Sequence, residues 1–214
     1  MSWFGRKKPF SRGAEAGQIV EGIQPSPGFE LLVQSTRRRR PGAVLDLGPT
    51  STESLQYLSK LAQEVDVCDI FQDASQRGRR ADKFRFEVDQ LELPDRQFDI
   101  VLVWDLLHYF DLPDRRKFGR LLADLTRDQA LILVLASNVA AIPPTPIHFK
   151  ILTEDRLYYV LPDGRKLPSP SLHTRQVEQV LAEFEPLRSF QLRNGMQELV
   201  FRRPATEPVE SPHG

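Results

Sequence analysis

The segment from Ala43 to Leu55 has the residue types expected where a protein binds an acceptor-rich ligand such as a nucleotide. The apolar run from Ala43 to Leu47 is typical of a buried strand, Gly48 permits a tight turn or a close backbone approach, and Thr50 to Glu53 offers caps for a following helix. A helix opened in this way presents unpaired N–H groups and the positive end of its dipole. A purely structural strand–turn–helix junction has the same pattern, so both interpretations stay open.

An acidic residue follows the next predicted strand. Asp69 ends an apolar run about twenty residues past Gly48, which is where a doubly wound domain places a carboxylate for ribose hydroxyls. The alternative is a strand-end acid that faces water. A ligand at this edge of the sheet would therefore be held by the loop at Gly48 and by Asp69.

The elements that must position these residues alternate between apolar and amphipathic runs. Strands are predicted over 43–47, 64–69, 84–88, 98–103 and 130–135. Helices are predicted over 29–35, 52–62 and 113–125. The alternation favours a parallel sheet with helices on both faces.

The C-terminal part predicts antiparallel structure. Leu157 to Leu167 is typical of a hairpin around Pro162-Asp163-Gly164, and Thr174 is expected to cap a helix. Asn194-Gly195, between two apolar runs, predicts a second hairpin. The expected fold class is α/β, with a doubly wound, mostly parallel seven-stranded sheet that ends in an antiparallel hairpin.

Composition indicates one domain with polar ends. We expect a flexible N-terminal arm over 1–26, the domain over 27–203 and a disordered tail over 204–214. Lys+Arg and Asp+Glu balance at 29 each, which gives no support for a nucleic acid or an anionic membrane as partner. A single cysteine, Cys68, allows no intramolecular disulfide and no cysteine-based metal cluster.

No segment predicts export or membrane insertion. The most apolar run, 130–136, is far shorter than the ~20 residues that span a bilayer. The basic residues near the N-terminus are not followed by an apolar export segment. The expected location is cytoplasmic, without a membrane partner.

Both layout and motifs resemble the class I S-adenosylmethionine-dependent methyltransferases. Val44-Leu-Asp-Leu-Gly48 resembles their first motif, and Val67-Cys-Asp69 resembles the second strand with its terminal acid. Val88-Asp89 with Leu93-Pro94, and then Gln97-Phe-Asp-Ile-Val-Leu-Val-Trp-Asp-Leu-Leu-His-Tyr109, is similar to the third and fourth motifs. The match runs from about Gly42 to Arg202 and is closest to the small-molecule-type subgroup. It implies a Rossmann-like methyltransferase fold with S-adenosylmethionine as cofactor.

The resemblance gives cofactor roles to three acids. Asp46, or a water bound to it, faces the ammonium group of the cofactor; the alternative is an acid that hydrogen-bonds the backbone of the glycine loop, since an unpaired carboxylate is costly to bury. Asp69 binds the ribose hydroxyls. Asp89 accepts a hydrogen bond from the adenine amino group, although a turn-forming Asp has the same sequence pattern.

Three residues after the strand over 98–103 lie at the same predicted edge. Trp104 covers the cofactor or substrate, or else belongs to the core. Asp105 positions the cofactor or its amino acid moiety, with helix capping as the alternative. His108, the one histidine placed near this edge, is either a base toward the acceptor or, as the favoured interpretation, a packed side chain. No catalytic residue is assigned, because methyl transfer needs alignment more than proton transfer.

The loop departs from the family where glycines are usual. Thr50 and Thr52 stand in place of the second and third glycines, and added Cβ atoms hold a ligand farther from the backbone. The Thr hydroxyl offers a hydrogen bond to the cofactor carboxylate in exchange. Pro49 fixes its own φ and removes one N–H donor.

Three functions therefore compete. The favoured one is a methyltransferase for a small-molecule acceptor, in which 142–172 covers the acceptor and Ile142 to His148 with the Tyr158-Tyr159 hairpin lines its pocket. The second is a methyltransferase-like binding or assembly module that has lost cofactor use. A nicotinamide dehydrogenase is third, because the glycine triplet and a hydride-transfer partner are absent.

Overall fold

A mostly parallel sheet forms the centre of the fold. The computed structural model describes residues 19–71 and 88–206. The strands of the central sheet are β2 (Ala43–Asp46), β3 (Glu64–Val67), β4 (Phe98–Val103), β5 (Thr126–Ser137), β10 (Glu185–Gln191) and β11 (Met196–Arg202). They lie in the order β10-β11-β5-β4-β2-β3, in which the four strands from β5 to β3 are parallel and β11 and β10 are antiparallel.

This arrangement confirms the predicted doubly wound α/β class. Six strands of the central sheet fall within the described residues, against the seven predicted. The strand predicted over 84–88 lies outside the described residues except for Val88, which begins a short 3₁₀-helix, η1 (Val88–Gln90).

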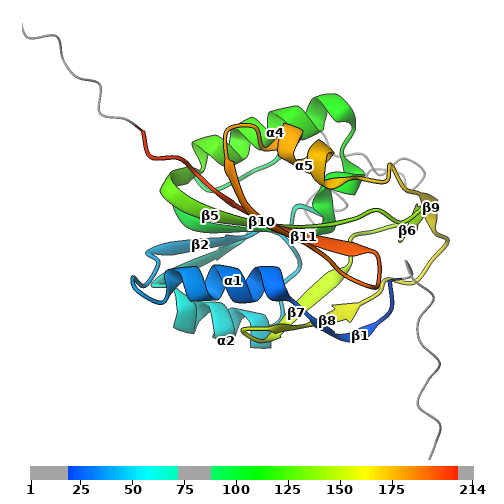
Figure 1. The fold of residues 1–214 in the computed structure, drawn as a ribbon, viewed down its shortest axis with the longest axis horizontal. Helices are drawn as coiled ribbons and strands as arrows, with labels where there is room; N and C mark the ends of the chain where they lie inside the picture. The colour runs from blue at the N-terminus through cyan, green and yellow to red at the C-terminus, as the bar shows by residue number, and fades with distance from the viewer. Residues whose placement is uncertain (1–18, 72–87, 207–214) are drawn as a thin grey trace, which may run out of the picture.

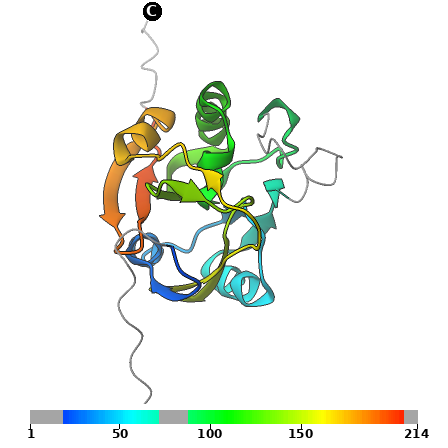
Figure 2. The same cartoon turned by 90° about the vertical axis from the view of Figure 1, so that its right-hand side faces the viewer.

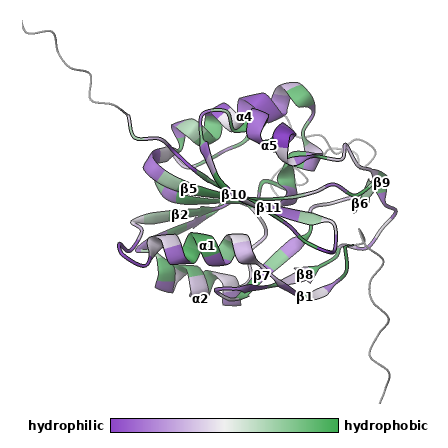
Figure 3. Cartoon of the chain, viewed as in Figure 1, coloured by the Kyte–Doolittle hydropathy of each residue, from purple (hydrophilic) through white to green (hydrophobic). Residues whose placement is uncertain are grey.

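Helices cover both faces of the sheet, as Figure 1 shows. On one face lie α1 (Pro27–Thr36) and α2 (Thr52–Leu61), and on the other α4 (Leu112–Asp124) and α5 (Thr174–Val180). Strand residues alternate between the two hydrophobic clusters that result: Leu45 packs with the α4 and α5 side, whereas its neighbour Val44 packs with the α1 and α2 side. Burial on both faces is why β2, β4 and residues 130–137 of β5 are mainly apolar, whereas the edge strands β3 and β10 are more polar (Figure 3).

A second, smaller layer covers one end of the fold. Its strands are β1 (Gly22–Pro25), β7 (His148–Thr153) and β8 (Arg156–Val160), with the short pair β6 (Ala141–Ile142) and β9 (Leu167–Pro168) beside it. Sheet order is β1-β8-β7, antiparallel throughout. Figure 2 shows this layer on the same side of the central sheet as α1 and α2. The 142–172 segment therefore does fold over the domain rather than away from it.

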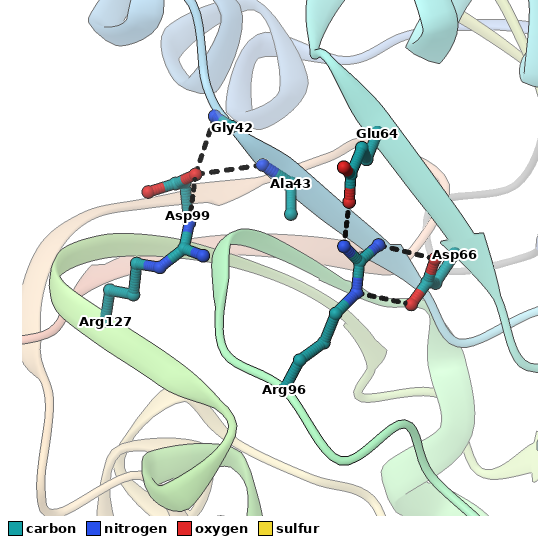
Figure 4. Close-up of polar contacts among 7 residues, drawn as sticks. All are labelled: Gly42, Ala43, Glu64, Asp66, Arg96, Asp99 and Arg127. Atoms are coloured by element: carbon teal, nitrogen blue, oxygen red, sulfur yellow. Dashed lines mark hydrogen bonds and ion pairs between the residues drawn. The ribbon is translucent and has the colours of Figure 1, made fainter.

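Charged side chains fix the amino-terminal edge of the parallel strands (Figure 4). The Asp99 carboxylate accepts hydrogen bonds from the backbone N–H of Gly42 at 2.6 Å and of Ala43 at 2.9 Å, and pairs with Arg127 at 2.9 Å. The Arg96 guanidinium binds both oxygens of Asp66, at 2.9 and 2.6 Å, and also pairs with Glu64. These contacts join the starts of neighbouring strands, so the opposite, carboxyl ends come together as one edge.

Three predictions about the elements are wrong in detail. Residues 22–25 of the predicted arm form β1, paired with β8, so the domain begins earlier than residue 27. The predicted Leu157–Leu167 hairpin is replaced by the β7–β8 hairpin, which turns at 154–155, because residues 156–160 find partners on both sides. The residue that caps α5 is His173, whose backbone N–H binds the Gln176 side chain at 2.9 Å, and Thr174 is the first helical residue.

The hairpin at Asn194-Gly195 is confirmed, and the helices over 29–35, 52–62 and 113–125 agree with α1, α2 and α4. Among residues 19–71 and 88–206, no helix has both the length and the apolar character that crossing a bilayer requires.

Candidate functional site

Four of the predicted site residues meet at the carboxyl edge of adjacent strands. Asp46 is the last residue of β2, Asp69 follows β3, and Trp104 and Asp105 follow β4. Strands β3, β2 and β4 are neighbours in the sheet. The carboxyl edge of an open parallel sheet is where such folds place their ligands.

Asp46 is buried and already hydrogen-bonded. Its side chain is 1% exposed, and Oδ1 accepts hydrogen bonds from Trp104 Nε1 at 2.5 Å and from the Gly48 backbone N–H at 3.2 Å. Burial raises the pKa of Asp46 to about 6, while the hydrogen bonds from Trp104, Gly48 and Thr50 act in the opposite direction. The contact with the glycine loop predicted as the alternative role of Asp46 is therefore present.

Gly48 is the point of closest approach between the loop and Trp104. A Cβ at position 48 would overlap Cδ1 of the indole and lie 3.0 Å from Nε1. The φ of Gly48 is not in the left-handed region, so the backbone itself does not require glycine there. Trp104 is 2% exposed and belongs to the hydrophobic cluster on the α1 and α2 side. The glycine is needed because the indole lies against it.

The rest of the loop leads into α2. Pro49 and Thr50 are half-buried, and Ser51 caps the helix with its Oγ accepting from the Ser54 backbone N–H at 3.1 Å. Thr52 is the first helical residue, so its side chain belongs to the helix start.

Asp69 and Asp89 differ in their surroundings. Asp69 is half-buried, and its negative charge raises the pKa of both Asp46 and His148, which places it within electrostatic reach of the two. Asp89 lies in η1 with its side chain 72% exposed and pairs with Lys117 of α4 at 2.5 Å. Asp89 thus has a cation as its partner at the rim of the domain.

Asp105 carries a buried carboxylate oxygen without a partner. Its Oδ1 accepts from the Ile147 backbone N–H at 3.2 Å, whereas Oδ2 has no hydrogen-bond partner among the described residues. The side chain is 1% exposed, and burial raises its pKa to about 7. Asp105 does not cap the short helix η2 (Asp105–Tyr109), whose N-cap is Trp104 without a side-chain bond.

His108 is a packed side chain. Its Nε2 accepts a hydrogen bond from the Ser137 backbone N–H at 2.8 Å, and the side chain is 6% exposed. Burial lowers its pKa to about 3, so it has little capacity to take up a proton at neutral pH. The structure supports the packed interpretation. The Nε2 lone pair already accepts from Ser137, so it is not available to take a proton from the methyl acceptor.

Residues 142–151, part of the segment predicted to cover the acceptor, make three hydrogen bonds to residues near the carboxyl edge of the sheet. Tyr109 donates its hydroxyl to the Pro143 carbonyl at 3.1 Å, the Ile147 N–H binds Asp105, and the Ile151 N–H binds Ser54 Oγ of α2 at 2.9 Å. Residues 142–151 are thereby fixed near the end of β4 and the start of α2. Tyr159 is buried and Tyr158 is half-buried in β8, within the layer that this segment forms.

The sequence predicted His148 only as the last residue of a pocket-lining segment and did not place it near Asp69. His148 begins β7, is half-buried, and its Nε2 is buried with no partner in the described part of the chain. Burial and the nearby Lys150 lower its pKa, and Asp69 opposes this effect. No local pattern places His148 beside Asp69, because the two are brought together only by the folding of β7 over the sheet edge.

Comparison with known proteins agrees with this geometry. A family model described as a methyltransferase domain matches residues 45–134, from β2 to β5. A search of curated protein sequences gives no match.

Solved methyltransferase structures share the fold at low sequence identity. The chain is 13% identical to the N-methyltransferase NodS from Bradyrhizobium japonicum, with TM-score 0.51 over 83% of this chain and 94% of NodS. An S-adenosylmethionine-dependent methyltransferase from Clostridium acetobutylicum gives TM-score 0.55 at 10% identity, over 84% and 92% of the two chains. Another, from Mesorhizobium loti, gives 0.52 at 15% identity, over 81% and 96%. Residues 45–134 therefore match a methyltransferase domain, and the chain has the fold of these solved methyltransferase structures.

Proposed function

We propose that this chain transfers the methyl group of S-adenosylmethionine to a small-molecule acceptor at the carboxyl edge of the sheet. The observation that carries the proposal is that three acids, Asp46, Asp69 and Asp105, follow or end three adjacent strands within a methyltransferase domain. Carboxylates suit a ligand that offers both a cation and hydroxyl donors.

The residues at this edge fit the cofactor. Asp105 Oδ2 is buried without a partner, and an ammonium group is a donor that would satisfy it. Asp46, to which the resemblance gives this role directly or through a bound water, already accepts from Trp104 and Gly48 at Oδ1. We therefore assign the ammonium group to Asp105, with Asp46 holding the loop, and the ribose hydroxyls to Asp69.

Two further contacts with the cofactor are expected, one at Asp89 and one at the loop residues Pro49 and Thr50. To accept a hydrogen bond from the adenine amino group, Asp89 must release Lys117. This ion pair is exposed, so breaking it costs little free energy. Pro49 and Thr50 form the loop wall beside the cofactor, with the Thr50 hydroxyl available to its carboxylate.

The chemistry requires alignment rather than a catalytic acid or base. S-adenosylmethionine supplies a methyl group already activated by its sulfonium. The chain's own residues would bind the ammonium and carboxylate groups and the ribose of the cofactor, orient the acceptor in line and exclude water under the 142–172 segment. His108 takes no part, because its Nε2 is committed to Ser137. Residues 142–151 are held in place by hydrogen bonds to Asp105, Tyr109 and Ser54. This fixed cover over the site favours a small methyl acceptor over a macromolecular one.

Isothermal titration with S-adenosylhomocysteine tests the proposal. We expect the wild-type protein to bind it, and Asp69→Ala to lower the affinity by roughly 10-fold to 100-fold through the loss of charge-assisted hydrogen bonds. Asp163→Ala, at an exposed loop acid, is the matched control and should bind like wild type.

A folded wild-type protein that binds neither S-adenosylmethionine nor S-adenosylhomocysteine at millimolar concentration would overturn the proposal and leave the non-catalytic module. Binding of NADH in the same titration would instead favour the dehydrogenase. Equal affinity of Asp69→Ala and wild type would show that the ribose assignment is wrong.

A further inference from the structure

Three parts of the Trp104 side chain, its N–H group, its Cδ1 edge and its ring face, contact three different residues. The indole N–H donates to Asp46 at 2.5 Å, the Cδ1 edge lies against Gly48, and the ring face stacks on Phe149 at 5.3 Å with the planes 16° apart. The first two contacts are with Asp46 and Gly48, at the start of the segment 46–51 that joins β2 to α2, called here the cofactor loop. The third is with β7, in the layer that covers the site.

The aromatic contact continues into the covering layer. Phe149 meets Tyr159 of β8 edge to face, with ring centroids 4.8 Å apart. All three rings are at most 2% exposed. Since β8 pairs with β7 and with β1, a displacement of Phe149 acts on a hydrogen-bonded sheet and not on one loose side chain.

A close-packed interior does not let the indole move alone. Gly48 and Phe149 lie against different sides of the same ring, so a shift away from the loop presses on β7, and a shift of β7 changes the space over the loop. The indole N–H is also the shorter of the two hydrogen bonds that hold Asp46 Oδ1. Moving the ring therefore releases the carboxylate at the end of β2.

We propose that Trp104 is a positioning residue that couples the cofactor loop to the layer covering the acceptor, through its hydrogen bond to Asp46, its contact with Gly48 and its stack on Phe149. The role in catalysis rests on the proposed function, because a cofactor that approaches the Gly48 backbone must displace the indole edge. That displacement moves Phe149, so cofactor binding and the position of β7 change together.

A ligand-free measurement tests the coupling by itself. In amide hydrogen exchange, Phe149→Leu removes the stacked ring and should speed exchange at the Gly48 amide at least tenfold, although the substituted residue lies in β7. Ile151→Val is the control, since it opens a cavity two positions along the same strand and leaves the stack in place. Trp104→Phe keeps a ring on Phe149 but lacks the N–H, so it should speed exchange at Gly48 and leave β7 as in wild type.

Phe149→Leu without an effect at Gly48, or Ile151→Val with an equal effect, overturns the coupling. These arms remain decisive if a variant is destabilised, because each compares two segments within one folded protein.

A spectroscopic measurement tests the link to the cofactor. The chain has two tryptophans and four tyrosines, so Trp3→Phe with selective tryptophan excitation makes Trp104 the only residue whose emission is followed. Addition of S-adenosylhomocysteine should change its emission and, in hydrogen exchange, alter protection of residues 148–153; Trp104→Leu should bind the ligand without that change in β7. Binding with unchanged emission and unchanged β7 overturns the inference, whereas absence of binding refutes the proposed function and leaves the ligand-free result to decide the coupling.

Discussion

Gly48 illustrates how one residue type can have two different reasons to be present. In the family pattern, a glycine after the strand lets a ligand approach the backbone. In this chain the atoms that approach Gly48 belong to Trp104, and the backbone has no left-handed φ that would call for glycine. The residue-level constraint is therefore a contact between the Gly48 backbone and the Trp104 side chain.

Gly48→Ala should destabilise the protein by about 1–3 kcal/mol, because the added Cβ overlaps the indole in a packed interior. The free energy of unfolding in urea measures this cost. In a Trp104→Leu background, which carries its own penalty, the added cost of Gly48→Ala should fall below about 0.5 kcal/mol.

Additive effects of the two substitutions would contradict the contact and return Gly48 to a purely backbone role. The double-mutant comparison is needed because either single variant is also expected to lose stability for reasons of its own.

At the scale of elements, two serines at the start of α2, Ser51 and Ser54, have separate roles. Ser51 caps the helix, since its Oγ accepts from the Ser54 backbone N–H at 3.1 Å. Ser54 lies one turn later and accepts from the Ile151 N–H of β7 at 2.9 Å. The first bond stabilises one helix, while the second joins a helix of the central layer to the layer that covers the site.

Ser54→Ala should cost about 1–3 kcal/mol and speed hydrogen exchange at Ile151, because it leaves a buried backbone donor without an acceptor. Ser51→Ala is the matched control. It should cost about 1 kcal/mol as a lost cap and leave Ile151 protected. Similar exchange at Ile151 in the two variants would show that Ser54 does not hold β7.

For the whole molecule, buried acids make stability depend on pH. Burial raises the pKa of Asp46 to about 6 and the pKa values of Asp105 and Glu198 to about 7. Glu198, in β11, accepts from Ser26 Oγ at 2.7 Å and from the Gly28 N–H at 2.6 Å, and so holds the start of α1. Each folded pKa lies above its unfolded value, so the stability contributed by these acids is complete below about pH 4 and is lost as pH rises to about 7.

Glu198→Gln should remove the part of this pH-dependent loss of stability that comes from Glu198. Its amide oxygen can accept from Gly28 while its amide nitrogen donates to Ser26, and it has no charge to bury. Relative to wild type, the variant should gain up to about 1 kcal/mol per pH unit between pH 5 and 7. Unfolding measured across this range checks the sign, and parallel profiles for the two proteins would contradict it.

Local chemistry explains which elements could be predicted. Strands β2 and β4 and residues 130–137 of β5 are mainly apolar because they are buried on both faces, and Gly195, with a φ of 82°, permits the hairpin turn at Asn194-Gly195. Pro162-Asp163-Gly164 also has residue types typical of a turn, and the sequence predicted a hairpin there. The hairpin formed instead at 154–155, since residues 156–160 pair with β7 on one side and with β1, far away in sequence, on the other.

The same distinction holds at the site. The sequence by itself determined the carboxyl-edge loop, the acids that follow β2, β3 and β4, and the fold that brings them together, because strand periodicity and helix caps are properties of short segments. Only the tertiary structure decided that Trp104 lies on Gly48 and holds Asp46, that Asp89 pairs with Lys117, and that His148 comes near Asp69. Those contacts join residues far apart in the chain, so no local pattern of residue types encodes them.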